Sequence, residues 1–130
     1  MLRQIVDGKG RIRISPAALR DLRMLLPRPA SRTIVMRHAM KLQHWRKGDD
    51  RALDLEVSDV PQSVFRELCV SDRFGFSCGI RLAFFEDTLS GRDGRLWVIG
   101  LRRDDEPLSE RMMDTLNDRR EIIEENGEKD

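Results

Sequence analysis

Three short strand-like segments constrain the fold more than any other feature of this chain. They are VFRELCV (64–70), GIRLAFFED (79–87) and GRLWVIGLRR (94–103). The loop between the last two ends in an Asp-Gly pair, which strongly favours a tight turn between strands. Strand-like segments this close together in sequence predict an antiparallel three-stranded meander.

Further regular elements are predicted on the N-terminal side of the meander. GRIRIS (10–15) predicts a strand whose isoleucines face inward and whose arginines, Arg11 and Arg13, face outward. SPAALRDLRMLL (15–26) predicts a helix that begins with a serine N-cap followed by proline. The apolar stripe of residues 30–48 predicts a second helix.

The remaining segments complete an α+β pattern. The acidic stretch DDRALDLEVSDVPQS (49–63) has no clear period, and we treat it as a link. An acidic C-terminal helix is predicted at about residues 108–126. The order β-α-α-β-β-β-α is typical of an antiparallel sheet with helices packed on one face. The 130 residues fit a single domain over 1–130.

Charge is distributed unevenly along the chain. Residues 1–48 contain 12 Lys+Arg against 2 Asp+Glu, whereas residues 103–130 contain 5 against 11. The basic part predicts a surface that faces a polyanion, and the acidic tail either lies against that surface or keeps the protein soluble. At the end of the second helix, basic side chains either contact phosphate or complement the helix dipole. The residues expected to contact nucleic acid are Arg11, Arg13, Arg37, Lys41, Arg46 and Lys47.

Several functional classes find no support in the sequence. It contains no apolar run of about 18 residues and no N-terminal secretory signal, so we expect a cytoplasmic protein without a membrane span. It has no Gly-rich phosphate loop, no Ser/His/Asp spacing and no metal-ligand cluster, so we expect neither a cofactor nor a metal. Cys69 and Cys78 are expected to be reduced thiols.

Three stretches, taken in order, are similar to a known family. RIRISPAALRDLRMLL resembles the family's opening strand and helix. VFRELCVSDRFGFSCGIRLAFFED resembles a pair of its strands, with Arg81 at the arginine of the second strand. GRLWVIGLRRDDEPLSERMMDTLNDRREIIEE resembles its ending, with Arg102 and Arg103 at a basic pair. The family is the RelE/ParE toxin superfamily, most closely its HigB or phage-derived branch, and the likeness spans roughly residues 11–125.

The resemblance implies a toxin of a toxin–antitoxin pair that inhibits translation and is neutralised by a cognate antitoxin protein. Family members of this kind cut messenger RNA on the ribosome through attack of a 2′-hydroxyl on the adjacent phosphate. That chemistry needs a proton acceptor, cations to stabilise the phosphorane and a proton donor for the leaving oxygen. Arginine suits the cationic role because its fork matches two phosphate oxygens. The resemblance therefore implies catalytic roles for Arg81, Arg102 and Arg103 in a metal-independent RNA endonuclease.

Other interpretations remain open at this stage. Each of these arginines could instead be a solvated side chain, with Arg102 and Arg103 paired to the aspartates that follow them. The chain contains no tyrosine, unlike the strands of the family, which allows a gyrase-directed member or an inactive member that acts through protein–protein contacts. GKGRIRISPAALR also resembles the signature of AbrB/MraZ-type DNA-binding transcription factors, apart from one extra residue, Ser15. Such a factor needs a strand soon after its short helix, where this chain has the helical pattern of 30–48.

Overall fold

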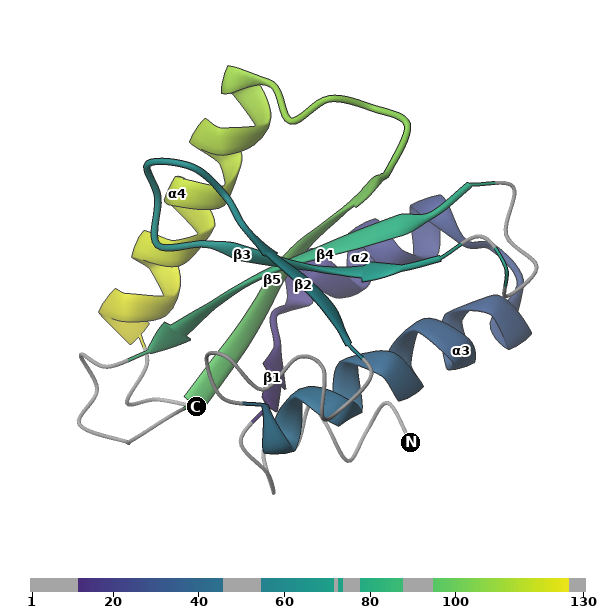
Figure 1. The fold of residues 1–130 in the computed structure, drawn as a ribbon. Coiled ribbons are helices and arrows are strands. Elements are labelled where there is room, and N and C mark those ends of the chain that lie inside the picture. Colours follow the sequence, from purple (N-terminus) through teal and green to yellow (C-terminus); the bar gives the residue numbers. More distant parts are fainter. Residues whose placement is uncertain (1–11, 46–54, 72, 74–77, 88–94, 127–130) are drawn as a thin grey trace.

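A five-stranded sheet with helices on both sides organises the fold (Figure 1). The computed structural model describes residues 12–45, 55–71, 73, 78–87 and 95–126. The strands lie side by side in the order β1-β5-β4-β3-β2. In chain order the elements are β1 (Ile12–Ile14), α2 (Pro16–Leu25), α3 (Pro29–Met40), the 3₁₀ helix η1 (Lys41–His44), β2 (Glu56–Asp59), β3 (Arg66–Val70), β4 (Ile80–Asp87), β5 (Arg95–Arg103) and α4 (Glu110–Asn126).

The α+β class and every predicted helix and strand are confirmed, and one further strand is present. This strand, β2, lies in the segment that was predicted to be a link. It pairs antiparallel with β3, so that Glu56 lies opposite Cys69 and Asp59 opposite Arg66. Three of its four residues are exposed, so an edge strand of this kind carries no alternation of apolar and polar residues.

The sheet is mixed, whereas a wholly antiparallel sheet was predicted. Strands β2 to β5 form an antiparallel meander, but β1 runs parallel to β5, with Arg13 opposite Trp97. The connections explain the difference. Helices α2 and α3 carry the chain from β1 at one edge to β2 at the other, and the meander then returns until β5 reaches β1.

Local signals at the first helix agree with the prediction. The Ser15 hydroxyl accepts a hydrogen bond from the Ala18 N–H at 3.1 Å, and Pro16 occupies the first helical position. The second helix ends earlier than predicted, because the α-helix stops at Met40 and tightens into η1. Trp45 then adopts an extended conformation and packs edge-on against Phe84, with ring centroids 5.6 Å apart.

Helices cover both faces of the sheet, not one face as predicted (Figure 1). On one face, here called the α2–α3 face, both helices pack against alternate side chains of the strands, such as Leu82 and Val98. On the opposite face, the α4 face, Leu116 and Ile123 pack against a separate group that includes Phe85. Successive side chains of a strand point to opposite faces. Strands β4 and β5 are apolar on both sides, so their pattern does not tell which face a helix covers.

Candidate functional site

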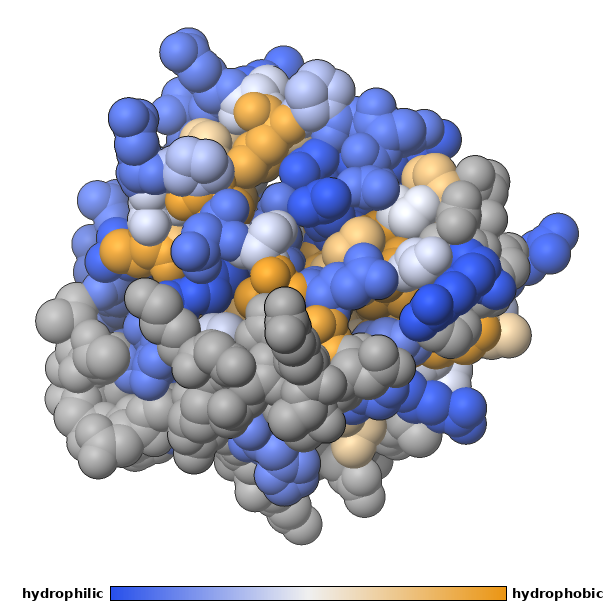
Figure 2. All heavy atoms as spheres, viewed as in Figure 1, coloured by the Kyte–Doolittle hydropathy of each residue, from blue (hydrophilic) through white to orange (hydrophobic). Residues whose placement is uncertain are grey.

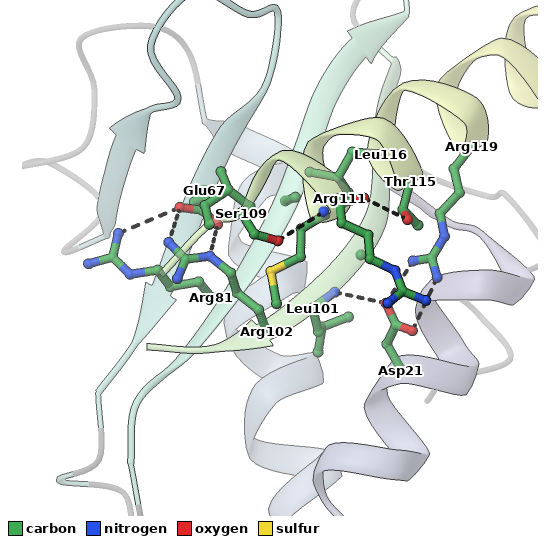
Figure 3. Close-up of a pocket in the computed structure, with 14 residues that line it drawn as sticks. Asp21, Glu67, Arg81, Leu101, Arg102, Ser109, Arg111, Thr115, Leu116 and Arg119 are labelled. Carbon is green, nitrogen blue, oxygen red and sulfur yellow. Dashed lines mark hydrogen bonds and ion pairs between the residues drawn. The ribbon is translucent and has the colours of Figure 1, made fainter. Parts of the chain in front are cut away.

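A pocket of about 340 Å³ lies between α4 and the α4 face of the sheet (Figure 3). Its volume is at the lower end of the range of about 300–1,000 Å³ that is common for small-molecule sites. Figure 2 shows apolar surface beside α4 with hydrophilic residues around it. The apolar part of its lining, here called the floor, comes from the sheet and from α4 with the segment before it: Ala83, Gly100, Leu101, Leu108, Met112 and Leu116.

The charged side chains of the pocket lie in two groups, one at each end (Figure 3). The first group, the Glu67 end, comes from β3, β4 and β5, the three central strands of the sheet. The second group, the Asp21 end, comes from α2 and α4. The Glu67 end contains Glu67, Arg81 and Arg102, and the Asp21 end contains Asp21, Arg111 and Arg119.

Glu67 is the centre of its end of the pocket. Its carboxylate accepts two hydrogen bonds from Arg102, at 2.8 Å from Nε and 3.0 Å from Nη2. Nη1 of Arg81 lies 3.7 Å from the same carboxylate. The Glu67 side chain is only 5% exposed, and a carboxylate so far from water is stable only when it is paired. The two arginines supply that pairing.

Arg81 and Arg102 meet because they lie opposite each other on β4 and β5. Arg81 also donates from Nε to Asp104, and this hydrogen bond is the main reason that its pKa is raised. A longer hydrogen bond of 3.4 Å joins its Nη1 to the Ser58 hydroxyl. Arg102 is held more firmly, because it also donates to the carbonyl of Glu106 in the turn before α4. Arg81 is therefore the more accessible of the two, with 28% of its side chain exposed against 15%.

Arg103, the third arginine expected at the site, lies apart from the other two. It follows Arg102 in the strand, so its side chain points away from the pocket, whose lining it does not join. Two hydrogen bonds, of 3.1 and 2.9 Å, join it to Asp105. This pairing raises the pKa of Arg103 and lowers the pKa of Asp105. The structure thus brings two of the three predicted arginines together.

The residues expected to contact nucleic acid do not form one surface with the pocket. Arg37 and Lys41 are exposed, but they belong to α3 and η1, which pack on the α2–α3 face. Arg13 was expected to face outward and instead is only 7% exposed. The reason is that β1 is buried on both faces, since Arg13 lies beside the buried Trp97 of β5. The other three, Arg11, Arg46 and Lys47, lie outside the described residues.

The Asp21 end of the pocket stabilises an exposed stretch of strand edge. Strand β1 pairs with β5 only as far as Val98, so the backbone beyond that point lacks a neighbouring strand on one side. The Asp21 carboxylate accepts a hydrogen bond of 3.2 Å from the Leu101 N–H. Arg119 donates to Asp21 at 2.7 Å and to the Ile99 carbonyl at 2.9 Å. These contacts give hydrogen-bond partners to the Leu101 N–H and the Ile99 carbonyl at the unpaired edge of β5, and they join α4 to α2.

A glycine permits α4 to approach the sheet at this point. A Cβ atom on Gly100 would lie 2.8 Å from Cδ2 of Leu116 and 3.3 Å from Nη1 of Arg119. Real Cβ atoms essentially never come as close as 2.8 Å to another side chain, so a larger residue would push Leu116 or the helix outward. The absence of a side chain at Gly100 therefore determines how closely α4 packs against β5 beside the pocket.

Arg111 is the least constrained cation of the pocket. It lies in the first turn of α4, is exposed, and extends over the Asp21 end in the view of Figure 3. No described residue forms a hydrogen bond or an ion pair with its guanidinium. Its positive charge is therefore available to an anionic ligand.

Sequence reasoning missed most of the polar lining of the pocket. For Glu67 a signal was present, because a carboxylate inside an otherwise apolar strand is rarely buried without a partner. Asp21, Arg111 and Arg119 gave no comparable signal, because each looks like an ordinary polar residue of an amphipathic helix. Only the packing of α4 across β5 towards α2 shows that they meet.

Two further features concern only the part of the chain that the structure describes. Among the described residues, no group of three or more His, Cys, Asp and Glu side chains is arranged to hold a metal ion. In the same part of the chain, no helix combines the length and apolar character needed to cross a membrane.

Comparisons with protein-family models, curated proteins and solved structures found no match to this chain.

Proposed function

We propose that this protein is a toxin-like RNA endonuclease that cleaves messenger RNA without a metal ion. The observation that carries the proposal is the meeting of Glu67, Arg81 and Arg102 at one end of an accessible pocket. One carboxylate and two guanidinium groups supply a proton acceptor and the cations that a phosphorane requires. The sequence resemblance to RelE/ParE toxins suggested the same two arginines.

In the proposed reaction, a ribose 2′-hydroxyl attacks the neighbouring phosphorus. Glu67 takes the hydroxyl proton as the bond from O2′ to phosphorus forms. The bond from phosphorus to O5′ of the next nucleotide breaks, and this oxygen takes a proton from solvent. The products are a 2′,3′-cyclic phosphate and a 5′-hydroxyl end. Arg81 and Arg102 stabilise the extra negative charge of the phosphorane.

The contacts support different roles for the two arginines. The Asp104 partner of Arg81 is 40% exposed, and an exposed ion pair of this kind contributes only about 0–1 kcal/mol. A substrate phosphate can therefore replace Asp104 at Arg81 at little cost. Arg102 is held by Glu67 and by the backbone of the turn before α4. In the proposed reaction Arg102 orients the Glu67 carboxylate and adds its positive charge near the phosphorane, while Arg81 binds the substrate phosphate directly.

The α2–α3 face supports a second contact with a polyanion, which we propose to be the ribosome. Residues 16–45 contain one acidic residue, Asp21, and that residue is turned towards the pocket. Such an excess of positive charge favours RNA binding. A cognate antitoxin protein is the proposed partner that neutralises the toxin. The exposed cations of this face include Arg20, Arg23, Arg28, Arg37 and Lys41.

A second candidate function is that of an inactive member of the toxin fold that acts by binding another protein. The specific observation in its favour is that each of the three arginines already has a carboxylate partner: Arg81 pairs with Asp104, Arg102 with Glu67, and Arg103 with Asp105. The DNA-binding alternative receives less support. The strand that its hairpin needs after the short helix is replaced by α3.

Induced expression with mapping of messenger RNA 5′ ends distinguishes the two candidates. We expect the wild-type protein to arrest growth and to produce new 5′ ends within translated regions. Arg81→Ala should abolish both effects, because the phosphate loses its most accessible cation. Arg103→Ala is the matched control, since it also removes a carboxylate-paired arginine but from outside the pocket. If the folded wild-type protein produces no new ends, the nuclease proposal is wrong and the inactive-member alternative is favoured.

A further inference from the structure

We propose that the apolar floor of the pocket is a subsite for a single nucleotide, the one whose 2′-hydroxyl attacks. Its 3′-phosphate lies at the Glu67 end and its 5′-phosphate binds Arg111 at the Asp21 end. This inference rests on the proposed RNA cleavage and adds a substrate-binding residue to it, because Arg111 lies outside the group that performs the chemistry. It also defines the smallest ligand that fills the pocket, a nucleoside 3′,5′-bisphosphate.

The shape of the pocket supports one nucleotide. Its volume of about 340 Å³ suits one small ligand, and its apolar floor separates two cationic ends. A nucleotide within an RNA chain has the same arrangement, with an apolar base face and ribose between two phosphates. Met112 lies along the floor, and its thioether makes favourable contacts with aromatic rings such as a nucleobase.

The distribution of charge at the Asp21 end favours binding of the second phosphate at Arg111. The carboxylate of Asp21 is already engaged by Arg119 and by a backbone N–H, so the pair is nearly neutral. Arg111 adds a positive charge that no described residue neutralises. A phosphate that binds there gains a charge-assisted hydrogen bond and separates no existing ion pair. This differs from the Glu67 end, where the phosphate has to displace Asp104 from Arg81.

Two hydroxyl groups beside the floor can bind the polar edge of a base. Ser109 accepts a hydrogen bond from the Met112 N–H at 3.2 Å, so its own hydroxyl proton remains available to donate. Thr115 donates to the Arg111 carbonyl at 3.0 Å, so its oxygen can still accept. The pocket therefore offers one donor and one acceptor near the ligand, in addition to its charges.

Calorimetric titration with defined nucleotides tests the subsite directly. The probes are the 3′,5′-bisphosphates and the 3′-monophosphates of adenosine and uridine, at low salt and with EDTA present. For at least one of the two bases, we expect the wild-type protein to bind the bisphosphate about tenfold more tightly than the monophosphate. Arg111→Ala should remove this difference, whereas Arg37→Ala, which removes the same charge from the opposite face, should retain it.

A second pair of variants tests whether the ligand lies on the floor of the pocket. Thr115→Phe places a large side chain at the pocket, and we expect it to weaken binding of both nucleotides at least tenfold. Asn117→Phe adds the same bulk at an exposed position of α4 outside the pocket and should bind as the wild type does. All four variants change exposed residues, so each is expected to fold.

The result that overturns the subsite is an equal affinity of the wild type for bisphosphate and monophosphate. Equal losses in Arg111→Ala and Arg37→Ala, or no loss in Thr115→Phe, overturn it as well. The result that rejects the proposed nuclease function is distinct from the results that reject the subsite. Bisphosphate binding that depends on Arg111, in a protein that never cleaves RNA, keeps the nucleotide subsite and rejects the nuclease.

Discussion

At the scale of single residues, the site depends on one buried carboxylate. Glu67 holds Arg102 through two hydrogen bonds and lies 3.7 Å from Arg81, so one side chain orients two cations. Removing it would leave the two guanidinium groups close together without the carboxylate that both of them face, which destabilises a protein strongly. Variants of Arg81, which is more exposed, are therefore better tests of chemistry than variants of Glu67.

Cys69 gives a residue-scale prediction for pH. Burial raises the pKa of this thiol above its ordinary value of 9.0, and the positive charge of Arg81 offsets part of that effect. Because the folded pKa is raised, this group contributes stability below the unfolded pKa that is lost as the pH rises through the folded pKa. At pH 8 we expect iodoacetamide to label Cys69 more slowly in the native protein than in denaturant, as followed by peptide mass spectrometry. Equal rates in the two states would contradict this account of the thiol.

At the scale of elements, α4 is attached to the rest of the fold by few contacts. Its buried residues are Leu116 and Ile123, and its polar attachment is the Asp21–Arg119 pair beside the free edge of β5. The pocket lies between this helix and the sheet. The position of α4 therefore determines the shape of the pocket, and the Asp21–Arg119 pair helps to set that position.

Asp21→Asn tests this attachment. The substitution removes the charge that holds Arg119 and weakens the hydrogen bond to the Leu101 N–H. We expect the free energy of unfolding to fall by about 1.5–3 kcal/mol, since hydrogen bonds to charged groups contribute about this much. Urea denaturation measures the change, and Asp118→Asn, at an exposed position of the same α4, is the control. A variant as stable as the wild type would show that other contacts hold the helix.

The sequence predicted elements better than it predicted how they pack. The serine cap of α2 and the apolar stripes are local signals, so the helices and the strands of the meander could be located in advance. The predicted turn at Asp93 and Gly94 lies outside the described residues. The polar edge strand β2 could not be located from the sequence. It is stabilised by pairing with β3 and not by burial of an apolar face, so it has no apolar pattern to recognise. The side of the sheet that α4 covers, and hence its meeting with Asp21, depends on contacts between distant segments. Of the three arginines that the resemblance grouped together, Arg81 and Arg102 meet because they lie opposite each other on adjacent strands, whereas Arg103 points away from the pocket.

At the scale of the whole molecule, the pocket and the basic helices lie on opposite faces of the sheet. The α4 face carries the pocket, and the α2–α3 face carries Arg37, Lys41 and other exposed cations. A long RNA or a ribosome can contact both faces, whereas a single nucleotide reaches only the pocket. Affinity for long RNA and affinity for the pocket ligand should therefore respond to different substitutions.

The double variant Arg37→Ala, Lys41→Ala measures this separation. Binding of an RNA oligonucleotide should weaken, and the slope of log affinity against log salt should fall by about 1 for each phosphate contact that is lost. Filter binding over a range of salt concentrations measures the slope. Binding of a nucleoside bisphosphate should stay unchanged as an internal control. An unchanged slope would show that the α2–α3 face does not contact the RNA.

The central claim is that Glu67, Arg81 and Arg102 support cleavage by a 2′-hydroxyl without a metal ion. The most direct test incubates the purified protein with ribosome-bound messenger RNA in EDTA and identifies the chemical ends of the products. We predict 2′,3′-cyclic phosphate and 5′-hydroxyl ends, and no cut at a nucleotide whose 2′-hydroxyl is replaced by hydrogen. Arg81→Ala and Arg102→Ala should abolish cleavage while Arg103→Ala retains it. Cleavage of the 2′-deoxy substrate, products with 5′-phosphate ends, or no cleavage by the folded wild-type protein would contradict the claim.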